Sequence, residues 1–202
     1  MLGGMETWVR NNARRLEKAH RLLKPAIAGL QGIWADMGCG DGIFTYLLFD
    51  YLQPGSEVYA VDKRQAALQQ LQQNIGGSLP EGKLHLVRAD FTRPLQLPPL
   101  QGILLANALH FVRGKAFALR QLINLLAPNG RLIVVEYNTH RGNAAVPYPI
   151  DERGFLALAR EVGLREPQIV IKAPSSFLDE MYTGMGIAPA TERVDKEGAD
   201  AT

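Results

Sequence analysis

A run of glycines and carboxylates is the part of this sequence best suited to chemistry. The segment Asp36-Met37-Gly38-Cys39-Gly40-Asp41-Gly42 closes a short apolar run over residues 33–37 and precedes an apolar, helical pattern over 43–52. Glycines let the backbone turn tightly and approach a ligand closely. A glycine loop that opens onto a helix indicates a nucleotide site, so this segment is the first candidate for function.

Two familiar glycine loops do not fit the segment. The dinucleotide fingerprint Gly-x-Gly-x-x-Gly requires glycine where this chain has Ile43, and the Gly-Lys-Ser/Thr ending of the phosphate loop is absent. Asp36 and Asp41 would also repel a pyrophosphate, whereas they suit a ligand with ammonium and sulfonium charges. A nicotinamide-dependent oxidoreductase on a similar sheet therefore stays an alternative, and the loop disfavours it.

Acidic side chains follow the next two predicted strands as well. Asp62 follows the strand predicted over 57–61, and a carboxylate there can accept hydrogen bonds from both hydroxyls of a ribose. Asp90 and Phe91 follow the strand predicted over 84–88. The carboxylate can accept the exocyclic amine of adenine, and the phenyl ring can lie against the base. Acids at the ends of three successive strands predict a nucleoside site.

These residues resemble those of the class I S-adenosylmethionine-dependent methyltransferases, from about residue 33 to 135 and more loosely to 181. The family pattern Asp/Glu-x-Gly-x-Gly-x-Gly is matched in full from Asp36 to Gly42. The resemblance implies S-adenosylmethionine as the cofactor. The cofactor-binding residues that it implies are Asp36, Gly38, Cys39, Gly40, Asp41, Gly42, Asp62, Lys63, Asp90, Phe91, Asn107 and Ala108.

The resemblance also implies a role for each part of this set. The three glycines would approach the methionine and ribose portions, Asp62 would bind the ribose hydroxyls, and Asp90 with Phe91 would hold the adenine. The segment 107–111, which follows the fourth predicted strand, would lie close to the transferred methyl group. In this family the protein mainly aligns the two partners for in-line displacement and excludes water.

A base is needed only where the acceptor must lose a proton, and His110 is the candidate because of its place after the fourth strand. A structural or cofactor-side role for His110 is the alternative. His20 and His85 are interpreted as structural. The long loop 137–149 offers candidates for binding the acceptor, of which Arg141 can pair with a carboxylate or phosphate. These candidates are His140, Arg141 and Tyr148.

Missing motifs narrow the class of acceptor. The Asn/Asp-Pro-Pro-Tyr/Phe motif of many base amino methyltransferases is replaced by Asn107-Ala108-Leu109-His110. The single cysteine, Cys39, lies in the glycine loop, so the thiolate of cytosine methylation and the several thiols of arsenic methylation are lacking. The acid cluster of metal-dependent catechol methylation is not visible. A small organic acceptor is therefore predicted, with no metal and with nucleic acid disfavoured.

Strands and helices alternate along most of the chain, which predicts a parallel sheet covered on both faces. The last two predicted strands, 168–172 and 177–181, have no helix between them and are expected to pair antiparallel. The predicted class is α/β: a Rossmann-like, doubly wound, seven-stranded and mostly parallel sheet with an antiparallel C-terminal strand. The other predicted elements are strands at 33–37, 57–61, 84–88, 103–106 and 131–137, and helices at 43–52, 64–75, 115–126 and 151–162.

The first element is predicted to be a helix within about residues 5–30, with a kink or a new turn at Pro25. One set of residues at helical spacing predicts a buried apolar stripe. This set is Leu16, Ala19, Leu23, Ile27 and Leu30. A second set at similar spacing is basic, and it is either a solvated face or a surface for an anionic substrate or RNA. The second set is Arg10, Arg14, Lys18 and Arg21.

Composition limits the remaining classes. The chain has 202 residues, of which 47% are hydrophobic and 21% charged, as in an ordinary globular domain. A net charge of +2, from 22 basic and 20 acidic residues, does not favour general polyanion binding. No apolar run approaches a membrane span, and no secretory signal is evident, so a soluble cytoplasmic protein is expected. Residues 1–187 are predicted to form one domain and 188–202 a disordered tail.

Two further functions stay open beside a small-molecule methyltransferase and an oxidoreductase. The basic helix face is compatible with an RNA methyltransferase. A protein that binds the cofactor without catalysis would share the same glycine loop.

Overall fold

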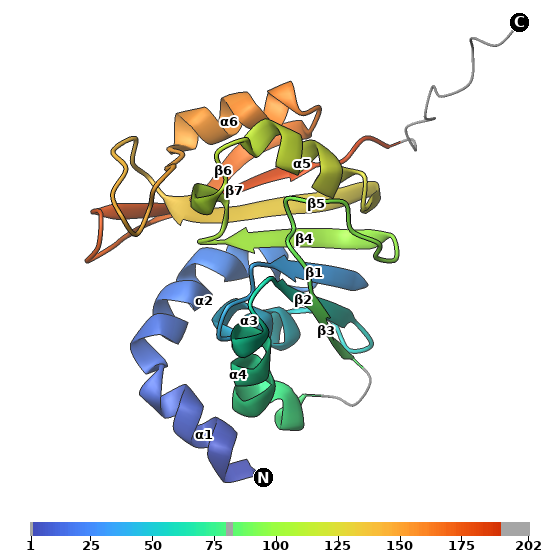
Figure 1. The fold of residues 1–202 in the computed structure, drawn as a ribbon, viewed down its shortest axis with the longest axis vertical. Helices are drawn as coiled ribbons and strands as arrows, with labels where there is room; N and C mark the ends of the chain where they lie inside the picture. Colours follow the sequence, from blue (N-terminus) through green and yellow to red (C-terminus); the bar gives the residue numbers. More distant parts are fainter. Residues whose placement is uncertain (1, 80–82, 191–202) are drawn as a thin grey trace, which may run out of the picture.

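In a computed structural model that describes residues 2–79 and 83–190, seven strands form one sheet (Figure 1). Their spatial order is β3-β2-β1-β4-β5-β7-β6. The strands are β1 (Ile33–Met37), β2 (Glu57–Asp62), β3 (Leu84–Arg88), β4 (Leu100–Ala106), β5 (Leu126–Tyr137), β6 (Arg165–Pro174) and β7 (Glu180–Ile187).

Strands β1 to β5 pair in parallel, and β7 pairs antiparallel with both β5 and β6. The chain builds the sheet outward from β1 through β2 to β3, and then returns to the other side of β1 with β4 and β5. The order therefore reverses between β1 and β4. This arrangement confirms the predicted doubly wound sheet with an antiparallel C-terminal strand.

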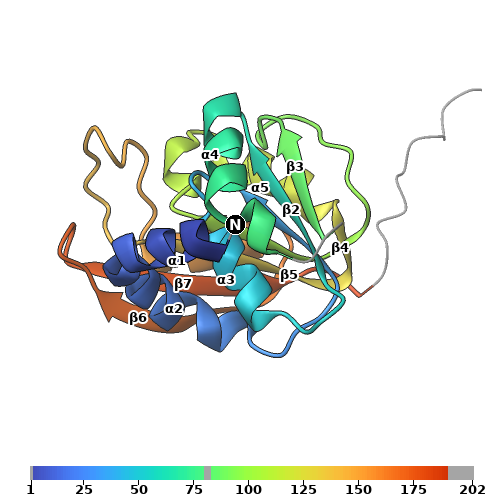
Figure 2. The same cartoon turned by 90° about the horizontal axis from the view of Figure 1, so that it is seen from below.

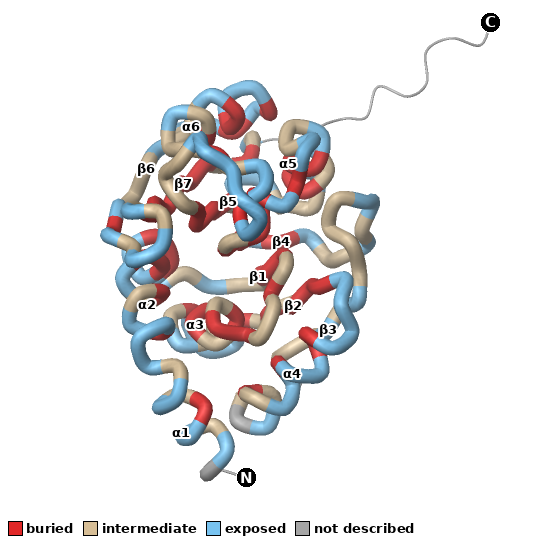
Figure 3. Tube along the Cα trace, turned by 60° about the vertical axis from the view of Figure 1, so that its left-hand side comes forward, coloured by how far each residue is buried: buried red, intermediate tan, exposed pale blue. Residues whose placement is uncertain are grey.

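Helices cover both faces of the sheet (Figures 1 and 2). One hydrophobic core joins Leu23 and Leu48 to Trp34 of β1, and the other joins Leu119 and Phe155 to the opposite face. Figure 3 shows that the buried residues follow the central strands and the helix sides turned toward them. The helices are α1 (Leu2–Asn11), α2 (Ala13–Ile27), α3 (Ile43–Tyr51), α4 (Gln65–Ile75), α5 (Lys115–Ile123) and α6 (Glu152–Glu161).

The N-terminal helix is interrupted at Asn12 and not at Pro25, which corrects the prediction. The Asn12 side chain donates a hydrogen bond to the carbonyl oxygen of Trp8 at 3.0 Å, and the backbone there leaves the helical region. Pro25 lies in the last turn of α2, where the helix continues to Ile27. The predicted apolar stripe of α2 is buried as expected, and Leu30, beyond the helix, is half-buried.

Glycines account for another error of prediction. Strand β7 was predicted at 177–181 and lies at Glu180–Ile187, because its glycines serve packing and do not end the strand. A Cβ at Gly184 would lie 2.3 Å from the ring of Phe155, so only glycine lets α6 approach this strand.

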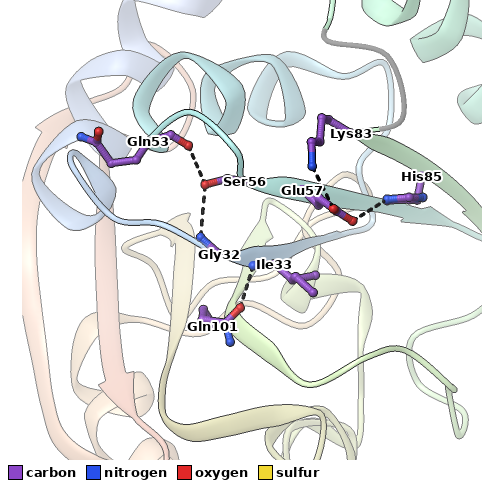
Figure 4. A network of polar contacts seen from close by, with 8 residues as sticks. All are labelled: Gly32, Ile33, Gln53, Ser56, Glu57, Lys83, His85 and Gln101. Atoms are coloured by element: carbon purple, nitrogen blue, oxygen red, sulfur yellow. Dashed lines mark hydrogen bonds and ion pairs between the residues drawn. The ribbon is translucent and has the colours of Figure 1, made fainter.

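A polar network holds the amino ends of four strands together (Figure 4). The Gln101 side chain accepts a hydrogen bond from Ile33 N at 2.6 Å, which joins β4 to β1. Glu57 at the start of β2 forms an ion pair with Lys83 and a hydrogen bond with His85, each at 3.0 Å. The polar contacts that join these parallel strands therefore lie at their amino-terminal edge. His85 belongs to this edge, and His20 contacts Tyr51 on the outer helices.

The C-terminal end of the described chain is attached to the sheet. Ala188 is buried and its N–H donates to the carbonyl oxygen of Gly130 at 2.8 Å. Residues 191–202 of the expected tail lie outside the described part of the chain. Among residues 2–79 and 83–190, the helices are all too short or too polar to cross a membrane.

Candidate functional site

A cavity of about 910 Å³ lies at the carboxyl ends of the parallel strands. In Figure 1 the ends of β4 and β5 point to the side where α2 and the turn between β6 and β7 lie. One half of the cavity is lined by residues that follow β1, β2 and β3. The other half is lined by residues that follow β4 and β5, by the β6–β7 turn and by α2. The cavity spans the reversal of strand order, where ligands of such sheets bind.

Most of the residues predicted from the sequence line this cavity. Those that do are Gly38, Cys39, Gly40, Asp41, Asp62, Lys63, Asp90, Phe91, Asn107, Ala108 and His110. Asp36 and Gly42 are not part of its lining. The structure does not bring His140, Arg141 or Tyr148 to the cavity wall. The residues of the same loop that line the cavity are Ala145 and Val146.

The three loop glycines all have left-handed backbone, with φ of +80°, +56° and +94°, but they serve different purposes. A Cβ at Gly38 would lie 2.9 Å from Ala108, and one at Gly42 would lie 2.9 Å from Leu71 of α4. A Cβ at Gly40 would meet only the carbonyl oxygen of Gly38, 4.0 Å away. Gly38 and Gly42 therefore permit close packing, while Gly40 presents bare backbone to the cavity.

Asp62 is the carboxylate that the sheet directs toward this backbone. It ends β2, its residue is only 5% exposed, and it accepts hydrogen bonds from Gly40 N at 3.1 Å and Arg64 N at 2.9 Å. These bonds fix the carboxylate beside the loop. Oδ1 also accepts from Arg64 Nε at 3.4 Å, whereas Oδ2 keeps a further lone pair and can still accept from a ligand.

The carboxylate of Asp41 is already paired. Arg15 of α2 binds both of its oxygens, at 2.5 and 3.1 Å, and so joins the N-terminal helix to the glycine loop. The expectation that Asp36 and Asp41 both face a cationic ligand therefore needs correction, because Asp36 is buried and Asp41 is neutralised by Arg15. Asp62 remains as the carboxylate between the loop and the cavity.

Asp36 lies under the loop and is 1% exposed. Its Oδ2 accepts a hydrogen bond from the Thr45 hydroxyl at 2.7 Å. Burial raises the pKa of Asp36 to about 7, and the nearby charge of Asp62 acts in the same direction. Burial, followed by the charge of Asp36, also raises the pKa of Cys39, so this thiol stays neutral and is no nucleophile.

The raised pKa of Asp36 predicts a specific dependence of stability on pH. Between about pH 4 and 7 the folded chain holds a proton that the unfolded chain releases, so folding becomes less favourable as pH rises. Asp36→Asn removes this loss. We expect the variant to gain about 2–3 kcal/mol relative to wild type between about pH 5 and 8. Urea unfolding at the two pH values measures the gain, and the exposed Asp50→Asn is the control. A pH-independent difference for Asp36→Asn would contradict the assignment.

Two side chains opposite the loop have acceptor atoms left for a ligand. Asp90 Oδ1 accepts bonds from the hydroxyl and N–H of Thr92, which lower the pKa of Asp90, while Oδ2 remains open. Asn107 has a left-handed φ of +52°, and its buried Oδ1 has no hydrogen-bond partner in the described part of the chain. A buried acceptor without a donor is rare in native proteins, and this one belongs to a residue of the cavity wall, where a ligand can supply the donor.

His110 is held by Glu136, a residue that the sequence analysis did not identify. The two side chains are 4% and 1% exposed, and His110 Nδ1 lies 2.6 Å from Glu136 Oε2. Glu136 Oε1 accepts the backbone N–H groups of Leu109 and His110, at 2.9 and 3.1 Å. Because a carboxylate only accepts, Nδ1 carries the proton of this hydrogen bond, and in the neutral imidazole Nε2 then has the free lone pair. The available signal was a lone acid after the apolar run 132–135.

Aromatic and apolar side chains form the half of the cavity around His110. Tyr137 lies 6.2 Å from His110 between ring centroids, and Phe177 meets Tyr137 edge-on at 5.4 Å. Burial raises the pKa of Tyr137, which therefore remains protonated. Lys18 of α2 lies on the same side, over the Tyr137 ring. These residues end β5, precede β7 or belong to α2, so no local sequence pattern groups them.

Comparisons with known proteins agree with this geometry. Residues 35–132 match the family described as a methyltransferase domain. No curated protein matches the chain in sequence. A solved S-adenosylmethionine-dependent methyltransferase from Aquifex aeolicus is similar with a TM-score of 0.65 and 14% identity, over 86% of this chain and 89% of that chain.

Two further solved structures have the same fold. The N-methyltransferase NodS of Bradyrhizobium japonicum has a TM-score of 0.65 and 18% identity, over 88% of this chain and 96% of its own. The mitomycin 7-O-methyltransferase MmcR has a TM-score of 0.64 and 17% identity, over 86% of this chain and 54% of its own. At such identities the similarity shows the fold alone.

Proposed function

Because residues 35–132 are a methyltransferase domain and the fold is that of the class I S-adenosylmethionine-dependent methyltransferases, we propose that this enzyme methylates a small-molecule acceptor in the cavity described above. The observation that carries the proposal is the bare backbone of Gly40 beside the fixed carboxylate of Asp62. A ribose needs both features, because its hydroxyls require the Asp62 carboxylate as an acceptor and its ring requires the space beside Gly40.

The residues of the cavity fit S-adenosylmethionine. Asp62 would accept the ribose hydroxyls, Asp90 Oδ2 the adenine amine, and Phe91 would lie against the base. The unpaired Oδ1 of Asn107 would accept a donor from the methionine portion. When bound, S-adenosylmethionine supplies a methyl group activated by a positively charged sulfur.

The protein's own contribution is alignment, exclusion of water and removal of a proton. The ends of β1 to β3 would hold the nucleoside, while the side chains after β4 and β5 would hold the acceptor, which keeps the two partners in a fixed relation. His110 Nε2 would take the acceptor's proton, and Glu136 would stabilise the resulting imidazolium. This base role applies to acceptors that must be deprotonated.

The contacts of the basic residues on the N-terminal helices favour a small acceptor over RNA. Lys18 lines the cavity and Arg15 binds Asp41, while Arg21 pairs with Glu17 on the same helix. Arg14 is exposed to solvent. The predicted basic stripe is therefore divided between the cavity and solvent, and it does not form a continuous surface for a phosphate backbone.

Calorimetry with S-adenosylmethionine, S-adenosylhomocysteine and NADH tests the proposal. We expect the first two ligands to bind and NADH not to bind. Radiolabelled methyl transfer to a panel of phenols, amines and carbon acids then identifies the acceptor class. Binding of NADH alone would reverse the proposal, and cofactor binding without any transfer would favour a noncatalytic protein.

Asp62→Ala is expected to weaken S-adenosylhomocysteine binding by about 10- to 100-fold, because ribose hydroxyls left without an acceptor cost about 1–3 kcal/mol. Isothermal calorimetry measures the change in Kd. Glu57→Ala is the matched control, since Glu57 is the carboxylate at the opposite end of the same strand, β2, away from the cavity. Equal effects of the two substitutions would show that Asp62 acts through the fold and not through the ligand.

A further inference from the structure

Lys18 is a charged residue of the cavity that neither the cofactor residues nor the base accounts for. Its Nζ donates to the Ser175 hydroxyl at 2.7 Å and lies 5.7 Å from the centroid of the Tyr137 ring. No ion pair joins it to a carboxylate within residues 2–79 and 83–190, and burial lowers its pKa. An ammonium held beside apolar walls without a counter-ion favours binding of an anion.

The walls beside Lys18 suit a flat, apolar ligand. Phe111 and Phe177 both line the cavity and are 58% and 42% exposed, which is unusual for side chains of this size. The Phe177 ring stands at 82° to Tyr137, so the two rings form a corner. A planar ring placed in this corner would cover exposed aromatic surface and make edge-to-face contacts.

The distances limit the size of this ligand. Lys18 Nζ and the His110 ring lie within 5.7 and 6.2 Å of the same Tyr137 ring, so they are no more than about 12 Å apart. A hydrogen bond at each end uses about 3 Å. The remaining length is at most about that of one aromatic ring with two substituents.

The charge expected of the ligand depends on how many cations are free to bind it. Arg15, which precedes Lys18 by one helical turn, already binds both oxygens of Asp41. The donor set offered at this end is therefore the Lys18 ammonium alone, because the Ser175 hydroxyl accepts from Lys18 and already donates to the carbonyl oxygen of Phe177 at 2.6 Å. That set matches a singly charged carboxylate better than a doubly charged phosphate.

We propose that the methyl acceptor is a small aromatic carboxylate, bound with its carboxylate on Lys18, its ring in the corner of Tyr137 and Phe177, and its reacting group toward His110. This inference rests on the proposed function, because it names the substrate class of the same site. Lys18 is then a specificity-determining residue. It selects acids over their neutral analogues and takes no part in moving the methyl group.

Binding of para- and meta-hydroxybenzoate, each compared with its neutral hydroxybenzamide, tests the inference. The titrations are followed by NMR with saturating S-adenosylhomocysteine. We expect wild type to bind at least one acid about tenfold or more tightly than its amide, since a hydrogen bond to a charged group is worth about that factor. The preference is expected to fall to near unity in Lys18→Met and Lys18→Gln, and to persist in Lys18→Arg.

Lys24→Met is the matched control, because Lys24 lies on the same helix and over a tyrosine ring, that of Tyr51, outside the cavity lining. It should keep the preference for acids. The inference is overturned if wild type binds no acid better than its amide, or if the preference survives in both neutral variants of Lys18.

Calorimetry with S-adenosylhomocysteine on the same samples separates the two proposals. Normal cofactor binding without a preference for acids would overturn the substrate class and leave the methyltransferase proposal intact. Failure of wild type to bind S-adenosylhomocysteine would overturn the proposed function itself. Unchanged cofactor affinity in the Lys18 variants also shows that they are folded.

Discussion

Gly40→Val is expected to weaken binding of S-adenosylmethionine by about 10- to 100-fold or more while the chain still folds. The side chain would extend from a position with no protein atom nearer than 4.0 Å, into the space that we assign to the ligand. Crowding of this kind costs about 1–3 kcal/mol or more, which corresponds to such a change in Kd. Calorimetry with S-adenosylmethionine and S-adenosylhomocysteine measures the loss.

Gly55→Val is the control for backbone strain. Gly55 has a φ of +92° in the turn between α3 and β2, and a Cβ there meets no atom within 4 Å. Both substitutions force a branched side chain into left-handed backbone, which costs about 1–2 kcal/mol of stability. Similar melting temperatures with different cofactor affinities would support the site. Equal affinities in the two variants would mean that the ligand does not approach Gly40.

Glu136→Gln is expected to reduce the rate of methyl transfer by about 10²- to 10⁴-fold for an acceptor that must lose a proton. The amide oxygen can still accept the N–H groups of Leu109 and His110, so the local fold is retained. The amide nitrogen would instead donate to His110 Nδ1. That reversal moves the imidazole proton to Nε2, and the histidine can no longer act as a base.

Initial rates with the best acceptor from the screen, together with cofactor affinity, check this expectation. Glu57→Gln is the matched control, because Glu57 also pairs with a histidine, His85, at the opposite edge of the sheet. Cofactor affinity should stay unchanged in both variants. A full rate in Glu136→Gln would restrict His110 to a structural role, the alternative that the sequence left open.

The sequence predicted the scaffold better than the acceptor side of the cavity, for a physical reason. Buried parallel strands are short apolar runs, so β1 and β3 were predicted with their observed ends. Each residue proposed to bind the cofactor ends its own strand or lies shortly after it, which places it at the sheet edge without further information. The register of β7 was missed because Gly184 resembles a strand breaker until the ring of Phe155 is seen to pack on it.

The acceptor side depends on contacts between residues far apart in the chain. Lys18 reaches Ser175 across 157 positions, and neither residue has a local pattern that indicates this contact. His110 was selected from its position after the fourth strand, but its partner Glu136 belongs to the next strand. Such pairs become visible only when the strand order is known.

Because the two halves of the cavity come from different strands, the acceptor side can change in sequence independently of the cofactor side. Mutations at Tyr137, Phe177 or Lys18 alter a region separate from Asp62 and Gly40, because the contacts come from different strands. Under the proposed function, replacements on the acceptor side would therefore change the acceptor and leave the cofactor contacts in place. Directed evolution toward new products would best confine its libraries to the ends of β5 and β6 and to the inner side of α2.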